Sequence, residues 1–336
     1  MSAASLRAGA VVIAFALDRL FGEPPARLHP VVWMGNALGA TGAPWPRLSP
    51  SSQFLRGAVA WIVGAGVVLT VAALAVAAIR RLPQLPPWTL LAQLLLMGIL
   101  LKPLLAWRML RDEVTAVECA LAAGLEQGRH RLSRLVSRDT RQLSAPQVRE
   151  SALESLAENL NDSLVAPLFW FSVGGLPAAA LYRFANTADA MWGYRGRWEW
   201  AGKWAARADD LLSYLPARLT ALLLALSAWR SPRGLRAVAR QTPSPNSGWP
   251  MGMLALALGV RLSKPGVYTL NAAAPEPGAT HTERAIGICS RAAWLTVAIS
   301  AAALAVESPY WNPRPIEREP IRALLERAYR GAKPEA

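Results

Sequence analysis

Long apolar stretches constrain the fold of this chain more than any other feature of its sequence. Residues 57–79, 88–107 and 284–306 each match the ~20 apolar residues that a helix needs to cross ~30 Å of hydrocarbon. Only 17% of the 336 residues are charged, against about 25% in an average globular protein. The sequence therefore predicts an integral membrane protein.

Two further apolar stretches need separate interpretation. Residues 8–17 lie between Arg7 and Asp18, and we expect them to form an uncleaved membrane anchor. Residues 164–182 contain helix-interrupting residues, and a straight span through them would put the polar clusters on either side of it on opposite faces of the bilayer. We therefore predict a re-entrant hairpin there, broken at Pro167, Gly174-Gly175 and Pro177.

The predicted fold class is all-α: a polytopic integral membrane protein with about four full spans, re-entrant or half-membrane helices, and a helical cytoplasmic loop. Residues 211–229 are a second half-membrane candidate, because only the part from 219 is mainly apolar. We treat 1–336 as a single membrane domain, with 108–162 as a helical cytoplasmic insertion and 307–336 as a surface tail. The tail mixes apolar and charged residues, a pattern typical of an amphipathic surface helix.

The formal charge of +14 comes mostly from arginines that lie between the apolar stretches. Cytoplasmic loops of membrane proteins carry this excess, so we expect the lipid bilayer as the partner and no nucleic acid. The predicted location is the bacterial inner membrane, with several passes and the active site facing the cytoplasm. Two distant cysteines and three scattered histidines indicate neither a disulfide framework nor a zinc site.

Carboxylates recur at helical spacing between residues 147 and 162. Ser144 can cap this helix and Gln147 can return the bond, which predicts a capping box. Acidic residues at every fourth position share one helix face, and this face carries Glu150, Glu154, Glu158 and Asp162. Like charges at that spacing repel by roughly 0.2–0.5 kcal/mol per pair, so the face needs a cation. Spacing alone leaves open a solvated acidic surface paired with arginines.

A second polar cluster follows the interrupted apolar segment. Asn186 and Asp189 are three residues apart and share a helix face, and Asp209-Asp210 come shortly after them. Carboxylate and amide oxygens are the ligands that Mg²⁺ prefers, usually one or two of them together with substrate phosphates. The two clusters together favour a magnesium and phosphate site over a solvated surface.

Taken in order, these motifs resemble the adenosylcobinamide-phosphate synthase family of cobalamin biosynthesis, the CobD/CbiB membrane proteins. The resemblance covers most of the chain. The motifs that carry it are Asp18 with Gly22-Glu23-Pro24 and His29-Pro30-Val31; Arg138-Asp139-Thr140; Glu154 to Asn159 with Asp162; Ala166-Pro167-Leu168-Phe169; Asn186 to Asp189 with Gly193-Tyr194; Arg207 with Asp209-Asp210; Tyr214 to Leu219; Ser244-Pro245-Asn246; Gly248-Trp249-Pro250; and Ala257-Leu258-Gly259. Three positions depart from the family pattern: Met251 stands where an acidic residue is usual, and Ser137 and Ser163 where glycines are.

The resemblance implies a reaction in which ATP drives amide formation between aminopropanol, or its O-phosphate, and a propionate carboxylate of adenosylcobyric acid. The implied cofactors are ATP and Mg²⁺, and further partners are other cobalamin-assembly membrane proteins or more copies of the chain. The alternative is a non-catalytic membrane regulator or corrinoid-binding relative on the same scaffold; a transporter is a third, weaker reading, since half-membrane segments with charges also occur there.

Spacing and resemblance together select the candidate site. The expected catalytic residues are Glu154, Glu158, Asn159, Asp162 and Asp189. The expected metal ligands are Glu158, Asp162, Asp209 and Asp210. The resemblance implies as substrate-binding residues Asp18, His29, Arg138, Asp139, Asn186, Tyr194, Arg207, Arg218, Asn246 and Trp249.

Overall fold

The computed structural model describes residues 3–82, 88–193, 196 and 198–306, and these are mostly helical. The expected tail helix at 307–336 lies outside the described residues. The helices are α1 (Ala3–Phe21), α2 (Pro30–Gly42), α3 (Pro50–Arg80), α4 (Trp88–Leu101), α5 (Trp107–Ala123), α6 (Leu125–Leu132), α7 (Ala145–Leu160), α8 (Ala166–Trp192), α9 (Lys203–Leu212), α10 (Tyr214–Ser227), α11 (Leu235–Ala239), α12 (Gly248–Leu258) and α13 (Ala279–Val306). Short 3-10 turns lie at Ala26–Leu28, Trp45–Arg47 and Lys102–Leu104, a π-helical turn lies at Asn161–Val165, and two strands are β1 (Leu262–Lys264) and β2 (Tyr268–Leu270).

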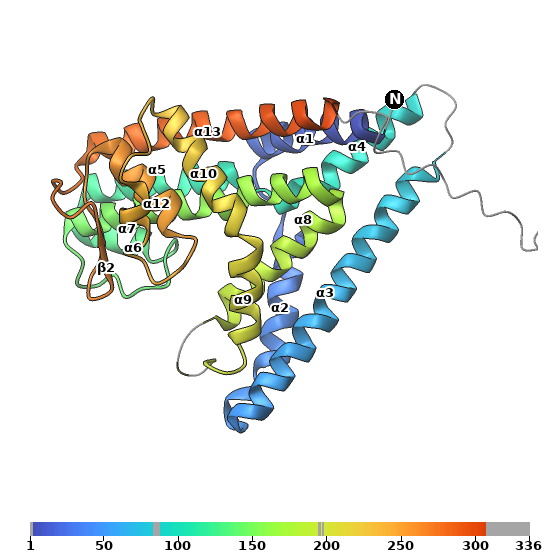
Figure 1. The fold of residues 1–336 in the computed structure, drawn as a ribbon, viewed down its shortest axis with the longest axis horizontal. Coiled ribbons are helices and arrows are strands. Elements are labelled where there is room, and N and C mark those ends of the chain that lie inside the picture. Colours follow the sequence, from blue (N-terminus) through green and yellow to red (C-terminus); the bar gives the residue numbers. More distant parts are fainter. Residues whose placement is uncertain (1–2, 83–87, 194–195, 197, 307–336) are drawn as a thin grey trace, which may run out of the picture.

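The helices form a large body and one projecting arm (Figure 1). In the body, α1 packs between α4 and α13, while α7 packs against α5, α12 and α13. The arm consists of α2, α3, α9 and the second half of α8, which extend away from the body. Each part has its own buried apolar cluster, and the smaller one, around Phe184 and Trp192, lies in the arm.

Four helical stretches are long and apolar enough to cross a membrane: Pro50–Arg80, Trp88–Ala123, Ala145–Trp192 and Ala279–Val306. Three of them contain the spans expected at 57–79, 88–107 and 284–306. The stretch 8–17 lies in α1, which is not among the four; it is partly covered by α4 and α13. The most apolar stretch, Pro50–Arg80, is only 17% buried, which suits a helix that faces lipid.

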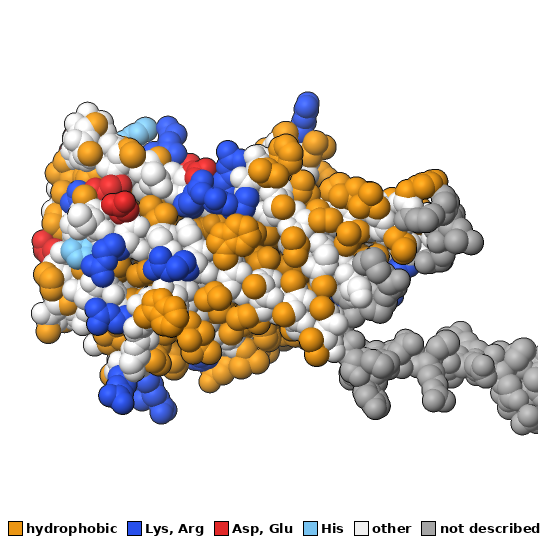
Figure 2. All heavy atoms as spheres, turned by 90° about the horizontal axis from the view of Figure 1, so that it is seen from above, with side chains coloured by type: hydrophobic (Ala, Val, Ile, Leu, Met, Phe, Trp, Pro, Cys, Tyr) orange, Lys and Arg blue, Asp and Glu red, His pale blue; other side chains and the backbone are white. Residues whose placement is uncertain are grey.

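Charged side chains are unevenly distributed over the surface. In Figure 2, lysines, arginines and acidic residues gather toward the end of the molecule that holds α5, α6 and α7, while apolar side chains cover most of the remaining face. The chain is thus an all-α polytopic membrane protein, as the sequence predicts.

The apolar segment inside Ala145–Trp192 is not a straight span, although its length and hydropathy alone would allow one. Backbone angles leave the helical region at Gly174 and Gly175, with φ 68° and ψ −159° at Gly175. The Asn186 amide donates to the Asp162 carboxylate at 3.1 Å. A straight helix would separate these two residues by about 36 Å, so the chain reverses between them. The predicted hairpin is confirmed, with its break at Gly174-Gly175. The expected breaks at the prolines are not seen, because Pro167 lies in the first turn of α8, where its missing N–H is tolerated, and Pro177 lies within the helix after the glycine pair. The depth of the hairpin in the bilayer stays a prediction.

Proline, glycine and alanine are frequent between residue 260 and about residue 279, a composition that predicts a loop, and this prediction is wrong in part. β1 and β2 pair antiparallel there, with Leu262 opposite Leu270 and Lys264 opposite Tyr268. Gly266, with φ +72°, lies between them. Leu262 and Leu270 are both fully buried. These two leucines pack in the apolar core of the body, and this contact stabilises the hairpin. Strands of three residues are too short to be recognised from an alternation of apolar and polar residues in the sequence.

We expect Gly175→Ala to destabilise the protein, because only glycine readily adopts the backbone angles at the reversal. The cost should be about 1–3 kcal/mol, seen as a lower melting temperature in detergent. Gly66→Ala in α3 is the matched control, since a Cβ there meets nothing within 4 Å. Equal melting temperatures for both variants would contradict the strain at Gly175.

Candidate functional site

The site is built around α7, which begins with the predicted capping box. The Ser144 hydroxyl accepts from the Gln147 backbone amide at 3.5 Å, and the Gln147 side chain accepts from the Ser144 amide at 2.8 Å. Pro146 occupies the first turn, where its missing N–H costs nothing. The helix is buried over most of its length, so its acidic side chains point into protein rather than into solvent.

The first two carboxylates of α7 are held by residues distant in sequence. Glu150 is fully buried; Arg261 donates to it at 3.2 Å, and the Ser263 hydroxyl also donates to it. Glu154 accepts from the Arg138 guanidinium at 2.7 Å. Its other oxygen, Oε1, is buried and has no hydrogen-bond partner within the part of the chain that the structure describes. Glu154 is therefore only half satisfied.

The β-hairpin closes over this end of α7. The Tyr268 phenol lies beside Glu154, and burial, together with this carboxylate, raises the pKa of the phenol well above its usual range. Tyr268 therefore stays protonated, and its hydroxyl donates to the Met251 sulfur at 3.8 Å. Met251, the position where the family pattern has an acidic residue, is thus buried next to Tyr268 and close to Glu154.

An acidic cluster lies at the other end of α7, where the chain reversal brings Asp162 to α8 and α9. The Asn186 amide donates both to Asp162 at 3.1 Å and to Asp209 at 3.4 Å. Tyr182 donates to the same Asp162 carboxylate at 3.3 Å. Arg183 donates to the Asp162 backbone carbonyl at 2.9 Å and to the Asn186 side chain at 3.3 Å. Asp162, Asn186 and Asp209 thus converge on one point.

The other expected acidic residues surround this point. Glu158 interacts electrostatically with Glu154 on one side and Asp162 on the other, as the four-residue spacing predicts. Asp189 interacts electrostatically with Asp210 and Asp162. The Asn159 side chain donates to the Ser155 carbonyl at 3.0 Å and to the Ser155 hydroxyl at 3.1 Å.

The donor set of the acidic cluster suits a hard cation. No group of three or more His, Cys, Asp or Glu side chains in the described residues is arranged to hold a metal by itself. Mg²⁺ does not need such a group, because it is usually held by one or two carboxylates together with substrate phosphates. Asp162 and Asp209 share the neutral Asn186 amide, and Asp162 also accepts hydrogen bonds from the neutral Asn161 and Tyr182 side chains. Arg183 brings one positive charge to a group of carboxylates that also includes Asp189 and Asp210, so negative charge is in excess.

A basic pocket of about 690 Å³ adjoins the acidic cluster. It lies between α10, α11 and the loop before α12, and its lining contains four arginines and two aromatic rings: Arg207, Arg218, Arg236, Arg240, Tyr214 and Trp249. Asn246 joins the two regions: it accepts from Arg218 at 2.7 Å and donates to the Asp210 backbone carbonyl at 2.7 Å. Arg207 also lies 4.0 Å from the Asp210 carboxylate. Negative and positive groups therefore meet at Asp210.

Asp18 and His29 belong to a separate ion-pair network. Lys102 lies 3.4 Å from Asp18 and 3.0 Å from Glu23, and His29 lies 2.8 Å from Glu23. Burial raises the pKa of Glu23, but the hydrogen bonds from His29 and Lys102 outweigh it and hold the pKa below its usual value. The Arg108 backbone amide donates to Asp18 at 2.9 Å. The network ties α1, the start of α2, and the start of α5 together, and Glu23 lies within electrostatic range of Arg183 in the acidic cluster.

Three of the residues expected to bind substrate remain to be placed: Arg138, Asp139 and Tyr194. Arg138 contacts Glu154, as above, and also Ser151 at 2.9 Å. Asp139 is exposed and pairs with Arg141, whose hydrogen bonds lower the pKa of Asp139 to about 2. Tyr194 lies outside the described residues.

Sequence reasoning missed several residues that the fold brings to the site. Arg183 could have been found, because it lies one turn before Asn186 on the same helix face. Arg236 and Arg240 are four residues apart and gave a similar signal. Tyr268 and Arg261 gave none, because their contacts with α7 are formed only by the β-hairpin.

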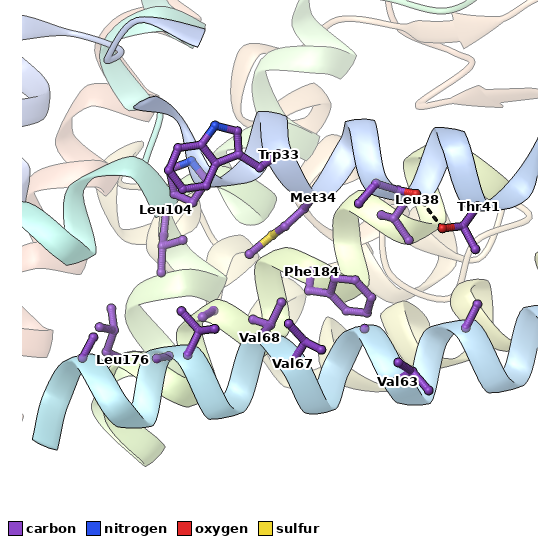
Figure 3. A pocket seen from close by; sticks show the side chains of 18 of the residues that line it. Trp33, Met34, Leu38, Thr41, Val63, Val67, Val68, Leu104, Leu176 and Phe184 are labelled. Carbon is purple, nitrogen blue, oxygen red and sulfur yellow. Dashed lines mark hydrogen bonds between the residues drawn. The ribbon is translucent and has the colours of Figure 1, made fainter. Parts of the chain in front are cut away.

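An apolar pocket lies on the opposite face of the second half of α8 (Figure 3). It has a volume of about 510 Å³ between α2, α3 and α8, and Met34, Val67 and Phe184 point into it. The described residues that line it include no charged side chain. The pocket thus suits a hydrocarbon group and not a phosphate or a carboxylate.

We expect Arg261→Gln to lower stability, because it leaves the buried Glu150 carboxylate with Ser263 as its remaining partner. An uncompensated buried charge costs more than a lost neutral hydrogen bond, so a loss of about 1–3 kcal/mol is expected, seen in the melting temperature. Adding Glu150→Gln should recover part of it, because no buried charge then remains. Additive effects of the two substitutions would contradict a direct ion pair.

Comparison with known proteins agrees with the motifs. The family described as "CobD/Cbib protein" matches residues 11–298. The chain is 42% identical over 275 residues to the probable cobalamin biosynthesis protein CobD of Methanothermobacter thermautotrophicus, covering 77% of this chain and 85% of that protein. It is 39% identical over 315 residues to the cobalamin biosynthesis protein CobD of Rhodobacter capsulatus, covering 88% and 98%.

A third relative, the cobalamin biosynthesis protein CobD of Chromobacterium violaceum, is 39% identical over 304 residues, covering 87% of this chain and 95% of that protein. No solved structure shows significant similarity to the chain. The family match over most of the chain and identities near 40% over nearly full-length relatives leave one assignment. The chain belongs to the CobD/CbiB family of cobalamin biosynthesis membrane proteins.

Proposed function

We propose that this protein uses ATP to join aminopropanol, or its O-phosphate, to a propionate carboxylate of adenosylcobyric acid. The observation that carries the proposal is the meeting of the acidic cluster and the basic pocket at Asp210. Amide synthesis from a free carboxylate needs both, since phosphates must be held and developing charge must be neutralised.

The proposed reaction has two steps. A carboxylate oxygen of the corrinoid attacks the γ-phosphorus of ATP, which gives an acyl phosphate and ADP. The amine nitrogen then attacks the acyl carbon, phosphate leaves, and the amine loses a proton. Glu158 and Asp189 lie at the cluster and have no direct ion pair with another described residue. We assign these two side chains to accept that proton.

The arginines and the metal have different roles in the proposal. Arg207 and Arg218 bind phosphate or carboxylate oxygens, which guanidinium groups can do in pairs of hydrogen bonds. Mg²⁺ bound by Asp162 and Asp209, with Asp210 and Glu158 nearby, would neutralise phosphate charge. Glu154 has the character of a positioning residue, because Arg138 already occupies one of its oxygens.

We expect Glu158→Gln to abolish amide formation while the protein stays folded, because the substitution keeps the shape and removes the charge and the proton acceptor. The measurement is mass-spectrometric detection of the amide from adenosylcobyric acid, aminopropanol phosphate, ATP and Mg²⁺. Glu126→Gln is the control, since Glu126 is an exposed residue paired with Arg129, and it should keep wild-type turnover. Normal turnover in Glu158→Gln would sink the catalytic assignment. A wild-type protein that binds the corrinoid but makes no amide would instead support the non-catalytic relative.

The proposed site faces the cytoplasm, where ATP is available. Three exposed positions lie close in sequence to the site: Ser137 next to Arg138, Trp204 in α9 before Asp209, and Gln241 next to Arg240 of the basic pocket. In a background without Cys119 and Cys289, cysteines at all three should react with an impermeant maleimide only after the cytoplasmic face is opened. Labelling of any one of them from outside intact cells would contradict the orientation.

A further inference from the structure

The basic pocket concentrates positive charge on one concave surface. Among the described residues, its lining includes four arginines and neither an aspartate nor a glutamate. Arg207 has one acidic neighbour, at the 4.0 Å limit of an ion pair. The side chains of Arg236 and Arg240 have no hydrogen-bond or ion-pair partner within 3–82, 88–193, 196 and 198–306. Such an excess of donors in one concave site calls for an anion.

The wall of the pocket is rigid where Arg218 lies. Its guanidinium donates to the Tyr214 carbonyl at 2.8 Å, to Asn246 at 2.7 Å and to the Pro245 carbonyl at 3.1 Å. It also stacks 3.6 Å from the centre of the Tyr214 ring and 4.7 Å from that of Trp249. Because these contacts fix its position, Arg218 loses little side-chain entropy on binding a ligand.

The opposite wall is fixed through its backbone. A Cβ at Gly248 would lie 2.1 Å from the Ala239 carbonyl oxygen, so the start of α12 is pressed against the end of α11. Thr242 donates to the Ala239 and Ser244 carbonyls at 3.1 and 2.9 Å, and the Ser244 hydroxyl accepts from the Asn246 amide at 3.2 Å. This turn places Arg236 and Arg240 opposite Arg218 while their side chains stay free to close on a ligand.

We propose that this pocket binds a phosphate group, with Arg236 and Arg240 supplying side-chain donors that no other residue in the described part of the chain uses. Planar guanidinium groups match the geometry of phosphate oxygens and form charge-assisted hydrogen bonds with them. The phosphate belongs either to a small soluble ester or to a lipid headgroup, since both carry the same group. Phosphate binding by the pocket does not depend on the proposed function. The assignment of this phosphate to a substrate does rest on the proposed function.

The test measures phosphate binding directly. Full-length protein in phosphatidylcholine nanodiscs is titrated with O-phosphoethanolamine, with ethanolamine as the probe that lacks the phosphate, and binding is followed by ³¹P NMR and calorimetry. Arg236→Gln with Arg240→Gln should weaken binding by about tenfold or more, the effect of losing one or two hydrogen bonds to a charged group. Arg233→Gln is the matched control, because this exposed arginine lies three residues before Arg236 and does not line the pocket.

A parallel arm uses nanodiscs that contain phosphatidic acid. If the double variant retains less phosphatidic acid than the wild type and neither protein binds the soluble ester, the phosphate comes from lipid and the pocket assignment holds. Equal binding by wild type and double variant in both arms overturns it, as does an equal loss in Arg233→Gln. Amide synthesis is assayed separately, so phosphate binding without synthesis removes the proposed function and leaves the pocket intact.

Discussion

The contact between Asp162 and Asn186 is the constraint on which the rest of the site depends. It closes the hairpin of α8, whose reversal at Gly174 and Gly175 carries Asn186 back to the end of α7. The same amide reaches Asp209, so three separate segments meet at one point. Without the reversal, the two polar clusters would lie a membrane thickness apart. The polar site therefore depends on the backbone reversal at Gly174 and Gly175, which lies in the apolar part of the chain.

The four acidic residues on one face of α7 have two kinds of role. Glu150 and Glu154 stabilise the structure, whereas Glu158 and Asp162 belong to the proposed site. Glu150 and Glu154 are held by Arg261, Ser263 and Arg138, and the β-hairpin covers them. Buried charges are tolerated only when paired in this way. Glu158 and Asp162, further along the same face, approach the acidic cluster and the basic pocket beyond it. The first pair fixes the helix, and this leaves the second pair in a defined position from which to act.

Much of this could be predicted from local sequence. The Ser144–Gln147 capping box and the four-residue spacing from Glu150 to Asp162 depend only on helix geometry, so they were recoverable. The Gly174-Gly175 pair predicted the reversal because few other residues permit it. The β-hairpin and the partners of Glu150 were not predictable, because Arg261 lies 111 residues away and its contact is set by tertiary packing. Local patterns also gave no indication that Asp18 and His29 would join a network centred on Lys102 and Glu23, since these pairings cross three helices.

Cross-linking between positions 162 and 186 tests the reversal most directly. Asp162→Cys with Asn186→Cys, in a background without Cys119 and Cys289, would be treated in native membranes with a short bifunctional thiol-reactive reagent such as a bis-methanethiosulfonate, which forms one mixed disulfide with each cysteine and releases sulfinate. The hairpin predicts rapid intramolecular cross-linking, detected by mass spectrometry of the joined peptides, because the native side chains are within hydrogen-bonding distance. A straight span would hold the two thiols about 36 Å apart. Absence of the cross-link, with both cysteines shown to be reactive individually, would contradict the structure of the site.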